Sequence, residues 1–516
     1  MFKKLVNLEL SRNQQTVINI TAAMLNMLVT TLISFVLSPY IVKTLGVEAN
    51  GFVGLAQNFT TYAALISTAL NSMGSRFMMM AYYNNEHDKF RRYYSSLLLA
   101  DLLLAVVFGI LGGLCVWRLE VLLNIPAAII RDVKLLFAMI FANFVVTTLC
   151  TVWASAAFLK NRLYLNSINT ALAAGTRAMV ILGLFLCLEP SVCFVGMATL
   201  VSGSLAHLIQ FFYKKTLFPE LRTRIADFSW SVIWELVSSG IWNTLSNVGY
   251  ILTSSIDLLV TNLFVNATAM GTLSLAHTMP TFVNTLNETV AGTFTPSLMI
   301  DYAQGRLDDL VSTIRQSAKI ISVICSLPLG FLLVYGREFY SLWQPTQDAR
   351  TLYSLSVVLI FGRVFFTGMQ PLFSVFTVVN RVRENSIVMI VNGFASVGLM
   401  YVLLKTTDLG IYAIVGSSVL CAFVKNMLFV IPFSAKYLGL KPTTFYGTVG
   451  YSVSCCIILL LWGALLRLFL RPDSWVLLLV SGVLFAGVGV ILSSMIVLNR
   501  SERGMLVSML RKKLTR

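Results

Sequence analysis

Long apolar stretches recur along the whole chain and are separated by short polar segments that contain most of the charged residues. A helix needs about 20 predominantly apolar residues to cross about 30 Å of hydrocarbon. Stretches of that length lie near residues 17–41, 52–79, 93–117, 135–158, 164–188, 191–213, 233–264, 270–300, 317–335, 351–378, 385–404, 409–434, 446–470 and 474–498. The pattern predicts an all-α, polytopic membrane protein of about 14 transmembrane helices.

The first apolar stretch follows a polar, basic segment and is too long for a cleaved signal peptide, so we expect a retained helix. Most of the 38 Lys and Arg residues lie on the side of the N-terminus, which predicts an inner-membrane protein with both termini in the cytoplasm. The basic tail from Arg500 to Arg516 is predicted to lie on anionic lipid.

Composition supports this interpretation. The chain is 57% hydrophobic and only 12% charged, whereas a soluble protein has about a quarter charged residues. The net charge of +16 therefore reflects cytoplasmic loops, and no nucleic-acid partner is expected. The cysteines and the three histidines form no metal-binding pattern, so neither a metal nor a cofactor is predicted.

An internal repeat relates two parts of the chain. The pattern N-R-x-x-x-N-S-I occurs at Asn161 and again at Asn380. G-F-V-G-L-A-Q at 51–57 matches G-T-L-S-L-A-H at 271–277 with nearly the same spacing. An even number of predicted spans separates the copies, so they have the same orientation, as in transporters with parallel repeats around a central cavity.

These spacings divide the chain into a six-helix lobe at 1–218, a second, pseudo-symmetric six-helix lobe at 219–440, and two extra transmembrane helices with a basic tail at 441–516. This organisation, the segment P-Y-I-V-x-x-L-G from Pro39 to Gly46 and the N-R loops resemble the multidrug/oligosaccharidyl-lipid/polysaccharide (MOP) exporter superfamily, and within it the Wzx-type polysaccharide flippases.

The resemblance implies a flippase that moves a polyprenyl-diphosphate-linked oligosaccharide from the inner to the outer leaflet by alternating access. Its partners would be this lipid-linked glycan, membrane lipids and, where other proteins take part, enzymes of polysaccharide assembly. A single chain should suffice, because the expected cavity lies between its own two halves. An enzyme is not expected, since the external loops are short.

Five predicted helices have polar residues at spacings of three or four, which places them on one face of each helix. The stripes are Asn19, Asn26, Thr30, Ser34 and Ser38; Gln57, Thr61, Thr68, Ser72 and Ser75; Asn243, Asn247, Tyr250, Ser254, Asp257 and Thr261; His277, Thr281, Asn284, Glu288 and Thr295; and Arg363, Thr367, Gln370, Ser374 and Thr377. Single Ser, Thr or Asn residues often just bond helices together. Five aligned stripes favour a polar cavity wall, with Asn26, Gln57, Asn247, Asn284 and Gln370 as substrate contacts.

Four cations in or near apolar stretches are candidate contacts for the diphosphate or an acidic sugar: Arg76, Arg177, Arg363 and Lys425. Placing an Arg at the centre of a span costs about 3 kcal/mol on insertion scales, so it needs water or a partner. Arg76 and Lys425 could instead extend to the cytoplasmic surface, and Arg363 could pair with Asp257 or Glu288.

The acidic residues Asp257, Glu288 and Asp101 are candidates for coupling to H⁺ or Na⁺. For Asp101, solvation near the inner surface is an alternative explanation. The main alternative function is a MATE-like antiporter that exports drugs or cations in exchange for H⁺ or Na⁺. Pro280, Pro296, Pro328, Pro371 and Pro432 interrupt predicted spans and are either hinges or static kinks.

Overall fold

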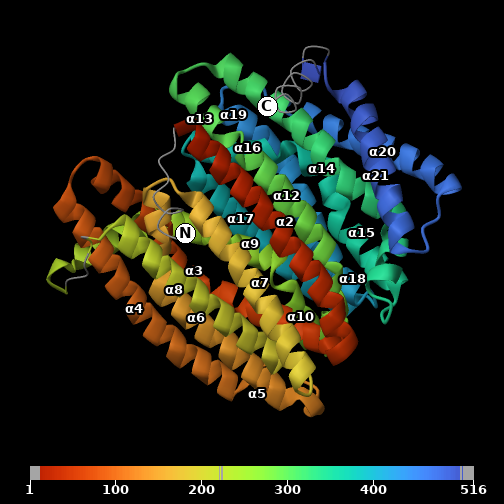
Figure 1. The fold of residues 1–516 in the computed structure, drawn as a ribbon. Helices are drawn as coiled ribbons and strands as arrows, with labels where there is room; N and C mark the ends of the chain where they lie inside the picture. Colours follow the sequence, from red (N-terminus) through yellow and green to blue (C-terminus); the bar gives the residue numbers. More distant parts are fainter. Residues whose placement is uncertain (1–11, 220, 222–224, 500–501, 504–516) are drawn as a thin grey trace. The chain divides into compact units, whose positions relative to one another are not determined.

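The computed structural model describes residues 12–219, 221, 225–499 and 502–503, and within these ranges the chain is helical and has no β-strand (Figure 1). Eleven helices of the described residues are long and apolar enough to cross a membrane. The predicted fold class, an all-α polytopic membrane protein, is confirmed. The predicted lipid-binding tail, apart from Glu502 and Arg503, lies outside the described residues.

Three of the 14 predicted spans are absent from these eleven, namely 52–79, 233–264 and 270–300. All three are nevertheless helical in the structure. All three stretches carry predicted polar stripes, and the third is divided into helices of 10, 15 and 9 residues, each too short to cross a membrane by itself. The count of 14 spans therefore remains a prediction, which depends on these three polar stretches.

The chain forms two compact units, Met1–Ser274 and Leu275–Arg516. Unit 1 contains α2 (Arg12–Leu45), α3 (Val47–Tyr83), α4 (His87–Trp117), α5 (Leu119–Leu122), η1 (Ala127–Ile129), α6 (Ile130–Leu159), α7 (Leu163–Cys187), α8 (Cys193–Leu217), η2 (Ile225–Asp227), α9 (Trp230–Ser254), α10 (Asp257–Phe264) and most of α11 (Ala267–Ala276). The compact units divide at 274/275, because α9 and α10 pack against α3. The predicted lobes divide at 218/219, where the sequence repeat begins again, and that division remains a prediction.

Unit 2 contains α12 (Thr278–Gly292), α13 (Thr295–Ala303), α14 (Leu307–Trp343), α15 (Ala349–Phe366), η3 (Thr367–Met369), α16 (Gln370–Val378), α17 (Val382–Thr406), α18 (Ile411–Lys425), the π-helical turn η4 (Asn426–Val430), α19 (Ile431–Tyr437), α20 (Gly447–Phe469) and α21 (Trp475–Val497). The long α14 packs against α15, α20 and α21. Gly463 permits close packing, since a Cβ atom there would lie 2.6 Å from a methyl carbon of Val334.

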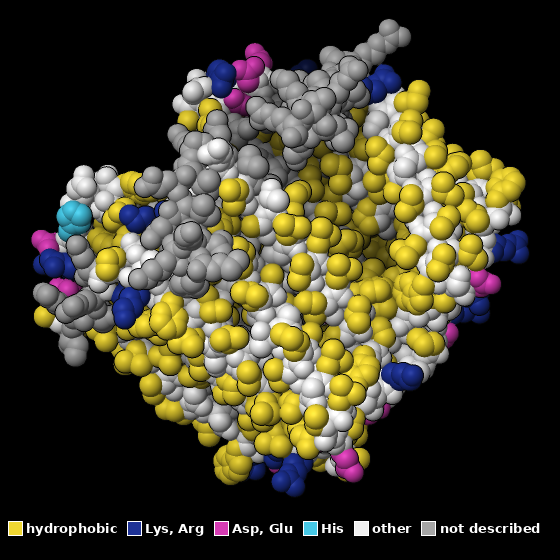
Figure 2. Space-filling model, in the orientation of Figure 1, with side chains coloured by type: hydrophobic (Ala, Val, Ile, Leu, Met, Phe, Trp, Pro, Cys, Tyr) yellow, Lys and Arg dark blue, Asp and Glu magenta, His cyan; other side chains and the backbone are white. Residues whose placement is uncertain are grey.

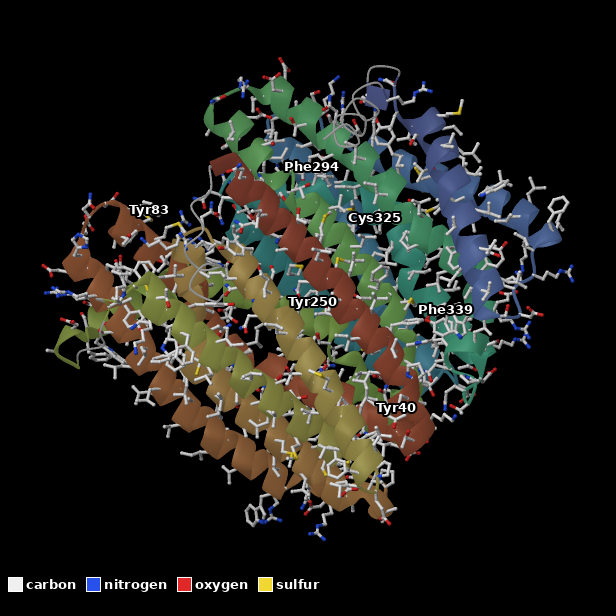
Figure 3. The ribbon with its side chains drawn as sticks, viewed as in Figure 1. Tyr40, Tyr83, Tyr250, Phe294, Cys325 and Phe339 are labelled. Carbon is white, nitrogen blue, oxygen red and sulfur yellow. The ribbon has the colours of Figure 1, made fainter. Side chains whose placement is uncertain are left out.

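In unit 1, α6 packs against α3, α4 and α8, and α2 packs against α7. Tyr40 of α2 and Tyr83 of α3 lie at opposite ends of this unit (Figure 3), as expected for two consecutive helices that each run its full height. Hydrophobic side chains cover the flanks of the helices on the face shown in Figure 2, whereas Lys, Arg, Asp and Glu gather near the helix ends. This is the surface expected of helices surrounded by lipid.

The repeat has a local structural counterpart. Asn161 and Asn380 both have a left-handed backbone conformation, with φ of 54° and 56°. In each loop the next residue, Arg162 or Arg381, donates its N–H to a carbonyl five residues earlier at 2.7 Å. This is the Schellman arrangement, which satisfies carbonyls at a helix end. Asn85 and Gly305, 220 residues apart, have the same conformation and bonding pattern at the ends of α3 and α13.

A second trace of the repeat is a contact in unit 1 between α3 and the first residues of α11. Thr268 Oγ1 donates a hydrogen bond to Glu48 Oε1, and these residues are 220 positions apart. Gly51 faces Gly271, and Gly54 faces Ser274, at the same separation. Each position therefore meets its own repeat partner, as residues on a two-fold axis do.

Four of the five predicted interrupting prolines lie in the first turn of a helix: Pro280 in α12, Pro296 in α13, Pro371 in α16 and Pro432 in α19. Proline is favoured there because its missing N–H would have no partner in any case. Pro328 lies inside α14. Four of the five prolines thus mark where helices begin within predicted spans.

Candidate functional site

The α9–α10 break in unit 1 exposes a backbone carbonyl that two side chains of α3 satisfy. Asn58 Nδ2 donates to the Ser255 carbonyl at 2.8 Å, and Tyr62 Oη donates to it at 2.6 Å. Asp257 begins α10 directly after the break and is 2% exposed. A helix can be interrupted within a membrane only where neighbours satisfy the freed backbone groups. The break between α9 and α10 is therefore stabilised by specific hydrogen bonds from α3.

Two further breaks are satisfied in the same way within unit 2. At the α11–α12 junction, Ser356 Oγ donates to the Ala276 carbonyl at 3.0 Å and also bonds the Tyr340 hydroxyl at 2.6 Å. At η3, the N–H of Gly368 donates to Ser452 Oγ of α20 at 2.7 Å. One of the two extra C-terminal helices thus holds the break between α15 and α16.

The predicted polar stripes partly remain on the surface. On α3, the exposed positions include Gln57, Thr61, Ser72 and Arg76; on α9, they include Asn247 and Ser254; on α12, they include Thr281, Thr285 and Glu288. Side chains that only bonded helices together would be packed away. Exposed polar faces on helices this long are costly against lipid, so they favour contact with water.

The candidate residues of unit 1 differ in their surroundings. Arg76, Gln57 and Asn247 are exposed, and Asn26 and Arg177 are half-buried. The Nε atom of Arg177 is buried and has no hydrogen-bond partner, and Arg177 forms no ion pair with any described residue. Asn26 Oδ1 is also buried without a partner. Arg177 therefore has no acidic counter-charge among the residues that the structure describes.

In unit 2, Arg363 at the end of α15 lies near enough to Lys425 at the end of α18 to act on it electrostatically. Lys425 Nζ lies 3.3 Å from Met389 Sδ and 5.8 Å from the centre of the Phe373 ring. It makes no ion pair with a described residue, and a π-helical turn follows it directly. Such turns are frequent at functional sites. Asn284 and Gln370 of the same unit are half-buried.

The three acidic candidates also differ in their exposure and in their contacts. Glu288 is exposed on α12 and pairs with no described residue, so the alternative of an Arg363–Glu288 ion pair is wrong. Asp257 acts electrostatically on Tyr62. Asp101 is 0% exposed, so the explanation of this residue by solvation near the inner surface is wrong. The helix pair α3 and α4 buries it, which position along the chain does not reveal.

Sequence reasoning missed Asn58, Tyr62, Tyr340, Ser356 and Ser452, which satisfy the helix breaks. The spacing of four between Asn58 and Tyr62 placed them on one helix face, but nothing in the chain identified their partner almost 200 residues away. Asn19, assigned to a cavity stripe, instead donates to the Asn161 carbonyl at 2.9 Å and accepts the Tyr164 N–H at 3.0 Å. No cluster of metal-binding side chains occurs among the described residues.

Comparisons with known proteins agree with this architecture. No family model matches the chain. An uncharacterized membrane protein EpsK of Bacillus subtilis (strain 168) is 28% identical over 495 residues, which cover 96% of this chain and 98% of that protein.

Solved structures resemble the chain at low identity. A multidrug resistance MATE family transporter of the MOP superfamily, in an inward-facing conformation, matches with a TM-score of 0.68 and 15% identity over 82% of this chain and 98% of the other. A MOP superfamily transporter from Pyrococcus furiosus, described as having a binding pocket of reverse polarity, matches with a TM-score of 0.59 and 16% identity over 85% of this chain and 98% of the other. These likenesses establish the fold.

Proposed function

We propose, for a chain with the fold of MATE transporters of the MOP superfamily, that it flips a polyprenyl-diphosphate-linked oligosaccharide from the inner to the outer leaflet. Alternating access would move the glycan and diphosphate in contact with polar helix faces, such as those exposed on α3 and α9 of unit 1. The polyprenyl tail would remain in lipid. In this proposal the protein lies in the inner membrane with cytoplasmic termini, and one chain suffices.

The observation that carries this proposal is the proximity of Arg363 and Lys425. Two positive charges repel each other strongly where the dielectric constant is low. Among the described residues, the Lys425 ammonium group contacts the thioether sulfur of Met389 and the ring of Phe373. A diphosphate would bring negative charge close to Lys425 and would accept hydrogen bonds from both side chains. The description of one structural neighbour as having a binding pocket of reverse polarity supports the proposal that pocket charge differs among proteins of this fold.

The test is reconstituted translocation in liposomes that contain polyprenyl-diphosphate oligosaccharides, with glycan accessibility measured on each leaflet. Arg363→Ala and Lys425→Ala should slow flipping at least about tenfold, the loss expected for a charge-assisted hydrogen bond of about 1.5 kcal/mol. Lys436→Ala is the matched control, because Lys436 is exposed in the same unit and lies 5.6 Å from the Phe433 ring. Normal flipping by both cavity variants would contradict the cationic site.

A second function, drug or cation export in exchange for H⁺ or Na⁺, is favoured by exposed, unpaired Glu288 and by the multidrug transporters that share the fold. A carboxylate on a polar membrane helix can bind a cationic drug or a coupling ion. The same liposomes distinguish the two functions. Gradient-driven export of a cationic dye that is lost in Glu288→Gln, without glycan flipping, would establish the antiporter.

A further inference from the structure

A fully buried carboxyl group lies between α3 and α4 in unit 1. Asp101 of α4 is 0% exposed, and its Oδ1 atom accepts a hydrogen bond from Asn71 Nδ2 of α3 at 3.0 Å. The second carboxyl oxygen, Asp101 Oδ2, is buried and has no hydrogen-bond partner. Asn71 Oδ1 is likewise buried and unpartnered. Two acceptor oxygens of one bonded pair thus lack a donor.

The surroundings of this pair are apolar. Leu70, Leu97 and Ala100, which adjoin it along α3 and α4, belong to a buried hydrophobic cluster. Close packing of the two helices is possible because Gly74 lies against Leu97, where a Cβ atom would approach a leucine methyl carbon to 2.6 Å. Water therefore does not solvate Asp101 in this structure.

No described cation neutralises Asp101, whose hydrogen-bond partner is the amide of Asn71. The nearest charged group on α3 is exposed Arg76, and Glu235 of α9 accepts a hydrogen bond from Tyr93 Oη. The other charged groups on α4 and on the elements packed against it are His87, Asp88, Lys89, Arg91, Arg92, Glu48, Glu120, Arg131, Asp132, Lys134, Asp227 and, directly after α6, Lys160. None of these forms a hydrogen bond or ion pair with Asp101.

An ionised carboxylate at this position would be an uncompensated buried charge, and such a group neutralises by binding a proton. A hard metal cation fits less well, because it is held by about six oxygen ligands. The hydroxyl groups one turn along α3 are already bonded: Ser67 Oγ donates to the Ala64 carbonyl, and Ser75 Oγ bonds Ser155 Oγ. Two oxygens remain, and a single proton between them satisfies both.

We propose that Asp101 and Asn71 form a proton-binding site, in which a proton carried on Asp101 Oδ2 is donated to Asn71 Oδ1. The amide and the acid then form a closed pair of hydrogen bonds, with no charge in the apolar core. The same helix α3 carries exposed Gln57, Thr61 and Arg76, so movement of α3 with a substrate would disturb the pair and release the proton. This coupling rests on the proposed transport function, whereas proton binding itself does not.

The first test needs no transported substrate. Infrared difference spectroscopy of the full chain in lipid should show the carbonyl stretch of a protonated carboxylic acid. Asp101→Asn should remove this band, and Glu288→Gln, which alters an exposed carboxyl group of unit 2, should leave it. Asn71→Leu should shift the band by removing the hydrogen bond to Oδ1. A band unchanged in Asp101→Asn, or its absence in the wild-type protein, would overturn the proposal.

The second test measures transport under an imposed pH gradient in the liposomes described above. The gradient should accelerate flipping by about fivefold or more in the wild-type protein, which corresponds to about 1 kcal/mol of coupling. Asp101→Asn, verified as folded by its Tm, should lose this acceleration and flip at one rate with or without the gradient. A retained response would overturn the coupling. Complete absence of glycan flipping would instead contradict the proposed function, and the infrared result would still decide the proton site.

Discussion

Gly51 and Gly271 lie so close together that a Cβ atom on Gly51 would be 2.8 Å from the Gly271 Cα atom. A Cβ atom on Gly271 would lie 2.2 Å from the carbonyl oxygen of Val47. Both distances are far shorter than any real contact of a Cβ atom, and both involve backbone atoms that cannot rotate away. Only glycine therefore fits on either side of this contact between repeat-related positions.

Gly271→Ala should accordingly destabilise unit 1 by about 1–3 kcal/mol, the usual cost of overpacking, and lower the Tm in detergent. The matched control is Gly175→Ala in α7, where a Cβ atom would have no neighbour within 4 Å. That substitution should leave the Tm unchanged or raise it, since Ala is the better helix former. Equal Tm values for both variants would show that the contact is looser than described.

Substitutions at Asn380 should change stability according to how well the new residue adopts the left-handed backbone conformation of this helix cap. Asn380→Val should cost about 1–2 kcal/mol, because a Cβ-branched residue clashes with its own backbone at φ of 56°. Asn380→Gly should be neutral in thermal unfolding. The same Val substitution at Asn161 should cost more, because the Asn161 side chain also accepts a hydrogen bond from Asn19 Nδ2 at 3.3 Å. Similar Tm values for Asn380→Val and Asn380→Gly would contradict the shared cap geometry.

The α9–α10 break should depend on its two donors together. Tyr62→Phe and Asn58→Leu each remove one hydrogen bond from the Ser255 carbonyl and should cost about 1 kcal/mol. The double variant leaves this carbonyl without a described side-chain donor, so its cost should exceed the sum of the two by about 0.5 kcal/mol or more. A double-mutant cycle on thermal unfolding measures this excess. Strict additivity would mean that the two side chains act independently.

An ion pair between buried Lys319 and half-buried Glu502 joins α14 to the start of the C-terminal tail. Lys319 of α14 is 9% exposed, and its Nζ atom lies 2.9 Å from each carboxylate oxygen of Glu502. Glu502→Ala should destabilise unit 2 by about 3 kcal/mol, because it leaves the lysine charge buried. Adding Lys319→Met should recover most of the lost Tm. If the double variant is no more stable than Glu502→Ala, the loss comes from the tail and not from the unpaired lysine.

The membrane helices and the repeat could be predicted because each is encoded locally. A run of about 20 apolar residues suffices for a span. The N-R pattern contains the residue that adopts the left-handed cap, so Asn161 and Asn380 revealed equivalent loops before any geometry was known. Proline positions indicated irregular points within the predicted spans, and four of the five lie in the first turn of a helix.

The rest depended on partners far along the chain. The α9–α10 break lies inside a single predicted span, and Asn58 and Tyr62, which stabilise it, are 197 and 193 residues from Ser255. The burial of Asp101 follows from close packing at Gly74, which a helical periodicity does not reveal. For the same reason Asn19, indistinguishable in sequence from a cavity residue, proved to hold the loop at Asn161.

The contact between positions 220 residues apart also bears on how such a chain evolves. In a dimer of identical subunits, a residue on the symmetry axis meets a copy of itself, so every mutation changes both sides at once. Two glutamates would repel each other there, whereas Glu48 here meets Thr268 and accepts its hydrogen bond. Gly54 similarly meets Ser274. Pairs of different residues at such positions require that both copies of the repeat lie in one chain. After gene fusion, each copy can be substituted independently of the other.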